Sequence, residues 1–144
     1  MLTRNIHVAL ALALTSVLLA CGGTQDSTGA GESTGSVSWE PGEWAFDAEL
    51  DPWPAAAGTP VTLRAVASVD DNDEPFSGTV SYRLATSDQT DSWTPMRHVG
   101  DDEGDRIYES TVTLPSQRVG IHFLVARSND GTIHELTDWA VVPQ

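Results

Sequence analysis

Met96 and His98 are the residues of this 144-residue chain whose types and spacing best fit a metal site. Side chains two residues apart on a β-strand point to the same face, so a thioether and an imidazole would be offered together. These soft ligands favour copper as Cu(I). His122 or His134 would have to complete the site, because two protein ligands hold a metal ion poorly. The competing interpretation is an ordinary exposed strand with Arg97 between the two residues.

The other two histidines of the mature chain, His122 and His134, lie on the arms of a hairpin whose turn is predicted at Asp130-Gly131. If these two residues alone form the turn, His134 pairs with Arg127 and His122 pairs with Trp139. The imidazoles then do not face each other, which disfavours a shared metal ion. Each is expected to be a partly exposed strand residue.

Two acidic runs, residues 70–74 and 101–105, offer carboxylate oxygens of the kind that bind calcium. Their spacing does not fit an EF-hand, whose loop needs Gly at the sixth position and Glu at the twelfth. Counting from Asp101, those positions hold Arg106 and Val112. Solvated turns are therefore the favoured interpretation of both runs.

Five tryptophans are many for so small a protein, and exposed ones can stack on sugar rings or anchor a protein partner. Three of them lie in a proline-rich segment that is too broken to bury all three side chains. An aromatic binding patch is therefore a candidate site, with packing at the rim of the domain as the alternative; its members are Trp39, Trp44, Trp53 and Trp93. Trp53 and Trp93 are the pair expected to bind carbohydrate.

The sequence contains no nucleophile motif, no phosphate-binding glycine loop and no metal-ligand spacing of a known catalytic kind. Its paired carboxylates fall in predicted turns. The chain is therefore expected to be non-enzymatic.

The elements that would position these residues are short strands. Alternation is clearest from Pro60 to Val69, where every second residue from Val61 is apolar. Clusters of Gly, Pro, Asn and Asp recur between such segments, and no helical period competes with them. The prediction is an all-β, immunoglobulin-like antiparallel sandwich of about seven strands, with a single closed sheet as the alternative. The predicted strands are Trp44–Leu50, Pro60–Val69, Gly78–Ala85, Trp93–Val99, Arg106–Leu114, Val119–Arg127 and Thr132–Val142.

The formal net charge is -14, from 21 acidic residues against seven basic ones, and all seven basic residues are arginines. A chain this acidic is repelled by nucleic acid and by anionic lipid headgroups, so neither is expected as a partner.

The first residues indicate the compartment. Arg4 gives a positive start, and the run from Val8 to Ala20 is almost wholly apolar but shorter than the roughly 20 residues that span a membrane. Residues 1–20 are therefore predicted to be a signal peptide. The tetrad Leu18-Leu19-Ala20-Cys21 resembles the lipobox of bacterial lipoproteins, which implies cleavage before Cys21 and acylation, with palmitate for example, on that residue.

Several acyl chains on Cys21 are sufficient to hold a protein on a membrane. By resemblance to lipoprotein sorting, Gly22 after the cysteine favours the outer membrane, on its periplasmic or surface face. Cys21 is the only cysteine, so no disulfide is expected in the domain. Residues 21–36, rich in Gly, Ser and Thr, are predicted to be a flexible tether, and residues 37–144 one folded domain.

Several segments of this domain resemble the start of YtkA-like and FixH-like periplasmic domains, which are immunoglobulin-like. They are Trp44, Leu50-Asp51-Pro52-Trp53-Pro54, Ala57-Gly58-Thr59-Pro60-Val61, the Asp-rich turn ending at Pro75, Gly78 to Tyr82, and Thr94-Pro95-Met96-Arg97-His98. The family is linked to copper and oxidase assembly, but its repeated methionines are missing here. Other segments resemble fibronectin-like and starch-binding modules, including Val80-Ser81-Tyr82-Arg83 and Phe123-Leu124-Val125-Ala126.

The sequence therefore predicts a membrane-anchored lipoprotein that serves as a binding or accessory module of the cell envelope. Its expected partner is an envelope protein or a glycan. The first alternative is a periplasmic copper-binding, metallochaperone-like protein that uses Met96 and His98. The second alternative is a carbohydrate-binding module that uses exposed tryptophans.

Overall fold

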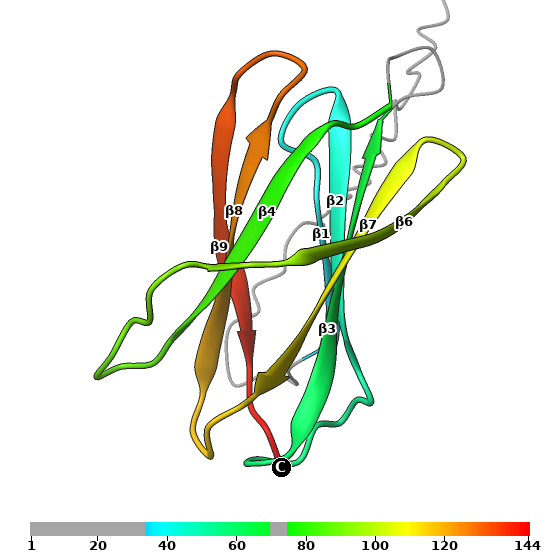
Figure 1. Cartoon of the computed structure of the whole chain (residues 1–144). Helices are drawn as coiled ribbons and strands as arrows, with labels where there is room; N and C mark the ends of the chain where they lie inside the picture. The colour runs from blue at the N-terminus through cyan, green and yellow to red at the C-terminus, as the bar shows by residue number, and fades with distance from the viewer. Residues whose placement is uncertain (1–33, 70–74) are drawn as a thin grey trace, which may run out of the picture. The chain divides into compact units, whose positions relative to one another are not determined.

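The computed structural model describes residues 34–69 and 75–144, which form a sandwich of two antiparallel β-sheets (Figure 1). The predicted signal peptide, Cys21, most of the predicted tether and the acidic run at 70–74 lie outside the described residues. Within the described part of the chain, no helix has the length and hydropathy needed to cross a bilayer.

The sandwich consists of a first sheet of five strands and a second sheet of four. The first sheet has the order β1 (Ser36–Trp39), β2 (Trp44–Asp51), β3 (Pro60–Val69), β7 (Asp105–Thr113), β6 (Arg97–Asp102). The second sheet has the order β5 (Thr94–Pro95), β4 (Gly78–Ala85), β8 (Val119–Arg127), β9 (Ile133–Val141). The expected all-β sandwich is confirmed, because the strands fall into two sheets and not one closed sheet.

The strand order is that of the immunoglobulin fold. Strands β2-β3-β7-β6 occupy the positions of strands A, B, E and D, and β4-β8-β9 occupy those of C, F and G. Strand β5 extends the second sheet beside β4. The described residues contain nine strands where about seven were predicted. Strand β1 was not predicted, and it begins at Ser36, one residue before the predicted start of the domain.

The other additional strand arises where the predicted strand 93–99 changes sheets. Met96 N–H donates to the Val80 carbonyl of the second sheet at 2.8 Å, whereas the next residue, Arg97, pairs with Glu109 of the first sheet. In Figure 1 the chain accordingly crosses from β4 to β7 over the front of the sandwich. Met96 lies between the two sheets and is only 7% exposed.

The core between the sheets follows from the period-two alternation of apolar residues. Strand β3 buries Val61, Leu63, Ala65 and Ala67, and β8 buries every second residue from Val119 to Val125. Phe46 of the first sheet and Phe123 of the second meet edge to face with ring centroids 5.0 Å apart, and neither is exposed. Burying one such side chain contributes about 1.5–3 kcal/mol. The core thus fixes the sandwich without a disulfide in the described residues.

The predicted register of the last hairpin is wrong. Strands β8 and β9 are joined by the longer loop 128–132, closed by Arg127 N–H to Thr132 C=O at 2.9 Å, and the register shifts again at a bulge between Ile121 and Phe123. His134 therefore lies opposite Val125, and Trp139 lies opposite Ile121. Asp130 stabilises the loop by accepting bonds from the backbone and hydroxyl of Thr132, which lower its pKa.

Candidate functional site

The structure does not bring Met96 and His98 to a common face. Met96 is part of the buried core, because the chain changes sheets at this residue, whereas His98 is exposed on β6. The expectation that both side chains point the same way assumed one regular strand from 93 to 99. The proposed pair of copper ligands therefore lacks the geometry on which it was based.

The His98 side chain is used locally in the β6–β7 hairpin. Its Nε2 lies 3.0 Å from the Gly100 carbonyl and 2.9 Å from Asp101 Oδ1, so it is placed to donate to both oxygens. Asp101 also accepts a bond from Arg106 Nε at 3.3 Å. The bond from His98, with the nearby positive charges, lowers the pKa of the Asp101 carboxyl. Asp101 belongs to the acidic run 101–105, which the structure places in this hairpin.

The described residues contain no group of three or more His, Cys, Asp or Glu side chains arranged to hold a metal ion. His122 and His134 are both partly exposed strand residues, as predicted. The ring of His134 lies against Trp44, with centroids 5.3 Å apart. His122 lies beside Gly120, where an added Cβ would be 3.0 Å from its Nε2. Burial and the charge of Arg83 lower the pKa of His122.

The four tryptophans of the predicted aromatic patch do not form one surface. Trp44 is only 4% exposed and belongs to the core, so the expectation of an exposed patch is wrong at this residue. Trp39 is partly buried against Phe46 and Phe123. Trp53 is also partly buried and lies against the backbone of Gly35. The rim packing considered as the alternative thus describes Trp39 and Trp53.

Trp93 takes part in a polar contact on the outer face of the second sheet that sequence reasoning missed. The Arg83 guanidinium lies 4.2 Å from the centroid of the Trp93 ring, and its Nη2 is 2.7 Å from Glu135 Oε1. Such cation–π contacts contribute about 0.5–2 kcal/mol and hold the ring in place. One face of the Trp93 ring is therefore occupied by the Arg83 guanidinium.

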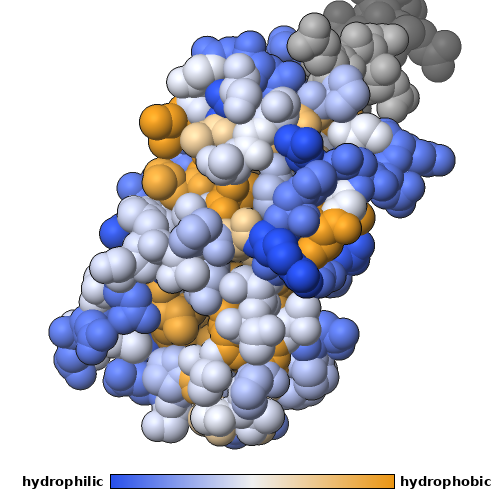
Figure 2. All heavy atoms as spheres, viewed as in Figure 1, coloured by the Kyte–Doolittle hydropathy of each residue, from blue (hydrophilic) through white to orange (hydrophobic). Residues whose placement is uncertain are grey.

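An opening of about 560 Å³ lies at the end of the sandwich, between the β4–β5 and β7–β8 loops. We call it the end groove. In the lower half of the view in Figure 2, apolar residues lie in hollows of the surface and hydrophilic residues surround them. The groove is lined by Ala57, Gly58, Leu84, Thr86, Gln89, Asp91, Thr113, Leu114, Pro115, Ser116 and Gln117. Its volume is within the range of about 300–1,000 Å³ that is usual for ligand sites.

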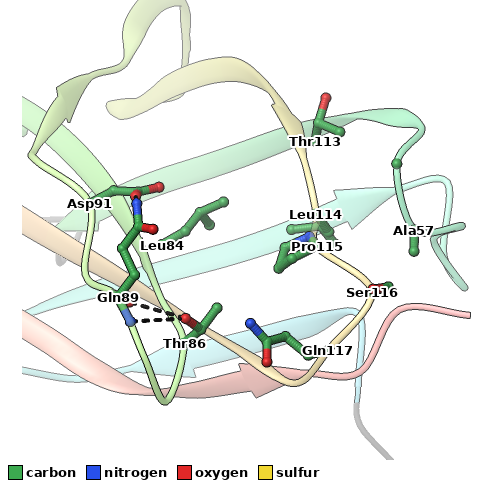
Figure 3. Close-up of a pocket in the computed structure, with 11 residues that line it drawn as sticks. Ala57, Leu84, Thr86, Gln89, Asp91, Thr113, Leu114, Pro115, Ser116 and Gln117 are labelled. Atoms are coloured by element: carbon green, nitrogen blue, oxygen red, sulfur yellow. Dashed lines mark hydrogen bonds between the residues drawn. The ribbon is translucent and has the colours of Figure 1, made fainter.

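One wall of the end groove is the β4–β5 loop, which its own hydrogen bonds hold in shape. Thr86 N–H donates to the Gln89 carbonyl at 2.7 Å. The Thr86 hydroxyl accepts from Gln89 N–H at 3.2 Å and donates to the Gln89 carbonyl at 3.3 Å (Figure 3). Asp91 N–H donates to the Leu84 carbonyl at 2.9 Å, and Asp91 Oδ1 accepts from Gln89 Nε2 at 2.9 Å. These bonds fix the loop before any ligand arrives.

The opposite wall is the β7–β8 loop, which is tied to the loop between β2 and β3. Gly58 N–H donates to the Leu114 carbonyl at 2.9 Å, and Ala57 N–H donates to the carbonyl of the C-terminal Gln144 at 2.8 Å. Gly58 has φ of 75°, a conformation that glycine adopts without strain. Gln117 lies across the opening from Thr86 in Figure 3. The groove is thus preformed between two braced loops.

The groove chemistry is a small apolar floor with polar walls. Leu84 and Leu114 supply the floor, and amide and hydroxyl groups of Gln89, Gln117 and Ser116 stand around it. Asp91 is the charged residue among the described lining residues, and none of the salt bridges found in the described part of the chain involves it. The lining therefore suits a ligand with an apolar group, neutral hydrogen-bonding groups and a cation.

Comparisons of the sequence with protein-family models and with curated proteins find no match. The resemblances to the lipobox and to YtkA-like and FixH-like domains therefore stay predictions.

The end groove was missed by sequence reasoning because its residues are ordinary loop residues. Thr86, Gln89 and Ser116 are typical of turns, and nothing in their spacing shows that two loops about 30 residues apart would face each other. The one residue that could have indicated the groove is Leu84, the last inward-facing residue of its predicted strand. An apolar side chain at the end of a strand, next to a polar loop, can line an opening at the end of a sandwich.

Proposed function

We propose that this chain is a non-enzymatic, lipid-anchored binding module of the bacterial cell envelope. The lipobox-like tetrad ending at Cys21 supports the anchor, and the Gly, Ser and Thr residues that follow supply a spacer between membrane and domain. Acylation at Cys21 leaves the sandwich free for binding, because the lipid alone provides the membrane affinity.

The observation that carries the binding role is the end groove. A preformed opening of about 560 Å³ between braced loops, with an apolar floor and polar walls, has the size and lining usual for a ligand site. Residues held on braced loops lose little conformational entropy when a ligand binds. An accessory role follows, in which the module holds a ligand or protein partner at the membrane.

The experiment is photo-crosslinking in intact cells with a benzophenone amino acid placed at Gln117, which lines the groove and is exposed. Glu49, exposed on the first sheet, is the control position. We expect a discrete adduct in the membrane fraction from position 117, absent from position 49 and lost when Ser116→Trp fills the groove. Equal labelling from both positions, or none from 117, would contradict binding in the end groove.

A further inference from the structure

Strand β7 has an uncovered edge beside the end groove. Strand β6 pairs with β7 only from Asp105 to Glu109, because β6 begins at Arg97 and the residue before it, Met96, is bonded to Val80 of β4. On that side no described strand pairs with Ser110–Thr113, although β3 pairs with these residues on the other side. Figure 1 shows the lower half of β7 free below the crossing chain.

The backbone groups along this edge can be assigned from the hydrogen-bond alternation of antiparallel strands. Leu50 N–H donates to Gly35 C=O, away from β3, so its partner Leu63 directs its own backbone groups toward β7. The backbone groups of the neighbouring Thr62 therefore face β2, and those of Thr111, which lies opposite Thr62, face the uncovered edge. By the same alternation, the backbone groups of Thr113 also face this edge. Both threonines are exposed.

Two hollows flank the edge, one on each side of the first sheet. The end groove lies toward the second sheet, and a hollow of about 290 Å³ lies on the outer face beside Thr62, Arg97 and Thr111. Successive side chains of a strand point to opposite faces. A strand added beside β7 would thus place one side chain in the end groove and its neighbours against the outer hollow.

We propose that this edge and the end groove together bind an extended peptide segment of a partner protein, which adds a strand to the first sheet next to β7. The inference rests on the proposed function, and it names the kind of partner. Backbone hydrogen bonds to Thr111 and Thr113 supply affinity, and the end groove selects the inward side chain. An aliphatic residue fits against Leu84 and Leu114.

Charge decides the flanking residues of the peptide. Asp91 borders the groove without a cation partner among the described ion pairs, and the whole chain carries a net charge of -14. A peptide with Lys or Arg two residues from its inward aliphatic residue, and so on the same face, is therefore complementary to Asp91.

The test uses the purified full chain in detergent and a bead-bound library of random nine-residue peptides. Selected peptides should alternate, with an aliphatic residue two positions from Lys or Arg. Each is then resynthesised with N-methyl groups on either of its two sets of alternate residues. One set should weaken binding about tenfold or more while the other has little effect, because only one set of N–H groups faces β7.

Protein variants locate the binding edge. Thr113→Pro removes an N–H at the uncovered edge, where proline is tolerated, and should weaken binding about tenfold, whereas Thr113→Val should not. Ile133→Pro is the matched control, because it alters the outer edge of β9 at a residue that is 67% exposed. Ser116→Trp should abolish binding by filling the end groove. Urea unfolding midpoints confirm that each variant is folded.

Three results overturn the inference: insensitivity to both N-methylated sets, equal binding by Thr113→Pro and the parent, and loss of binding through Ile133→Pro alone. A neutral glucan hexasaccharide serves as the second probe. If it binds and Ser116→Trp abolishes its binding while no peptide binds, the peptide inference fails and the proposed binding function stands. If neither probe binds and position 117 gives no adduct in cells, both fail.

Discussion

Replacing Gly78 with Ala should destabilise the sandwich strongly. Gly78 begins β4 opposite Arg127 of β8, and an added Cβ would lie 2.2 Å from the Ala126 carbonyl oxygen and 3.1 Å from the Arg127 Cα. Since both neighbours are backbone atoms, β4 must move away from β8. Gly78 C=O also accepts the Tyr108 hydroxyl at 2.8 Å, a bond that joins the two sheets. Burial raises the pKa of Tyr108, so its hydroxyl remains a donor.

The expected cost combines two effects. Overpacking costs about 1–3 kcal/mol, and loss of the Tyr108 hydrogen bond adds about 0.5–1.5 kcal/mol. Gly78→Ala should therefore lower the free energy of unfolding by about 2–4 kcal/mol and Tm by about 8–20 °C. Urea unfolding followed by tryptophan fluorescence measures the change. Gly100→Ala is the control, because nothing lies within 4 Å of its added Cβ, and it should change stability by less than about 0.5 kcal/mol.

A double-mutant cycle tests the reasoning further. Tyr108→Phe alone should cost about 1 kcal/mol, and the double variant should cost about 1 kcal/mol less than the sum of the single changes. This non-additivity is expected because Gly78→Ala already breaks the hydrogen bond that Tyr108→Phe removes. A Gly78→Ala protein as stable as Gly100→Ala would refute the close approach of β4 and β8. Strict additivity would show that the hydrogen bond survives the displacement.

Three further predictions concern the core and one histidine. Phe123→Ala should cost about 3–5 kcal/mol in urea unfolding, against less than about 0.5 for the exposed Ile133→Ala; equal losses would contradict the core. Met96→Ala should cost about 2–5 kcal/mol and Met96→Leu less than about 1.5, and a neutral Met96→Ala would place this residue at the surface. Burial and Arg83 lower the pKa of His122, so an NMR titration should place it below about 6.5. The unfolded state then takes up the proton first, so the free energy of unfolding falls as pH drops through about 6.5 toward the folded pKa, and His122→Gln should reduce this fall.

Period-two alternation was enough to predict most of the sandwich. The limits of β3, β4 and β8 match the predicted strands, because each buries one face and each ends at a Gly, Pro or turn residue. Alternation says nothing about which sheet a strand joins. The change of sheet at Met96 was therefore missed, and with it the burial that removes this methionine from the proposed copper site.

The candidate site was harder to predict because it depends on tertiary contacts. The predicted hairpin register was wrong because the connection takes in residues 128–132 and not two residues alone. Within it, the Asn129 side chain accepts from Ser77 N–H and donates to the Pro75 carbonyl, which are long-range bonds. Similarly, the end groove is formed by loops that are distant in sequence and come together only in the folded sandwich. Sequence periodicity carries no information about either event.

Attachment at Cys21 is the claim on which the envelope location and the proposed function depend, and fractionation tests it most directly. Cells that make the full chain or its Cys21→Ser variant are labelled with radioactive palmitate and separated into membrane and soluble fractions. The parent should be labelled and remain with the membranes after a high-salt wash, whereas Cys21→Ser should be unlabelled and absent from the washed membranes as a mature protein. Equal fractionation of the two proteins, with no palmitate on the parent, would contradict the lipid anchor.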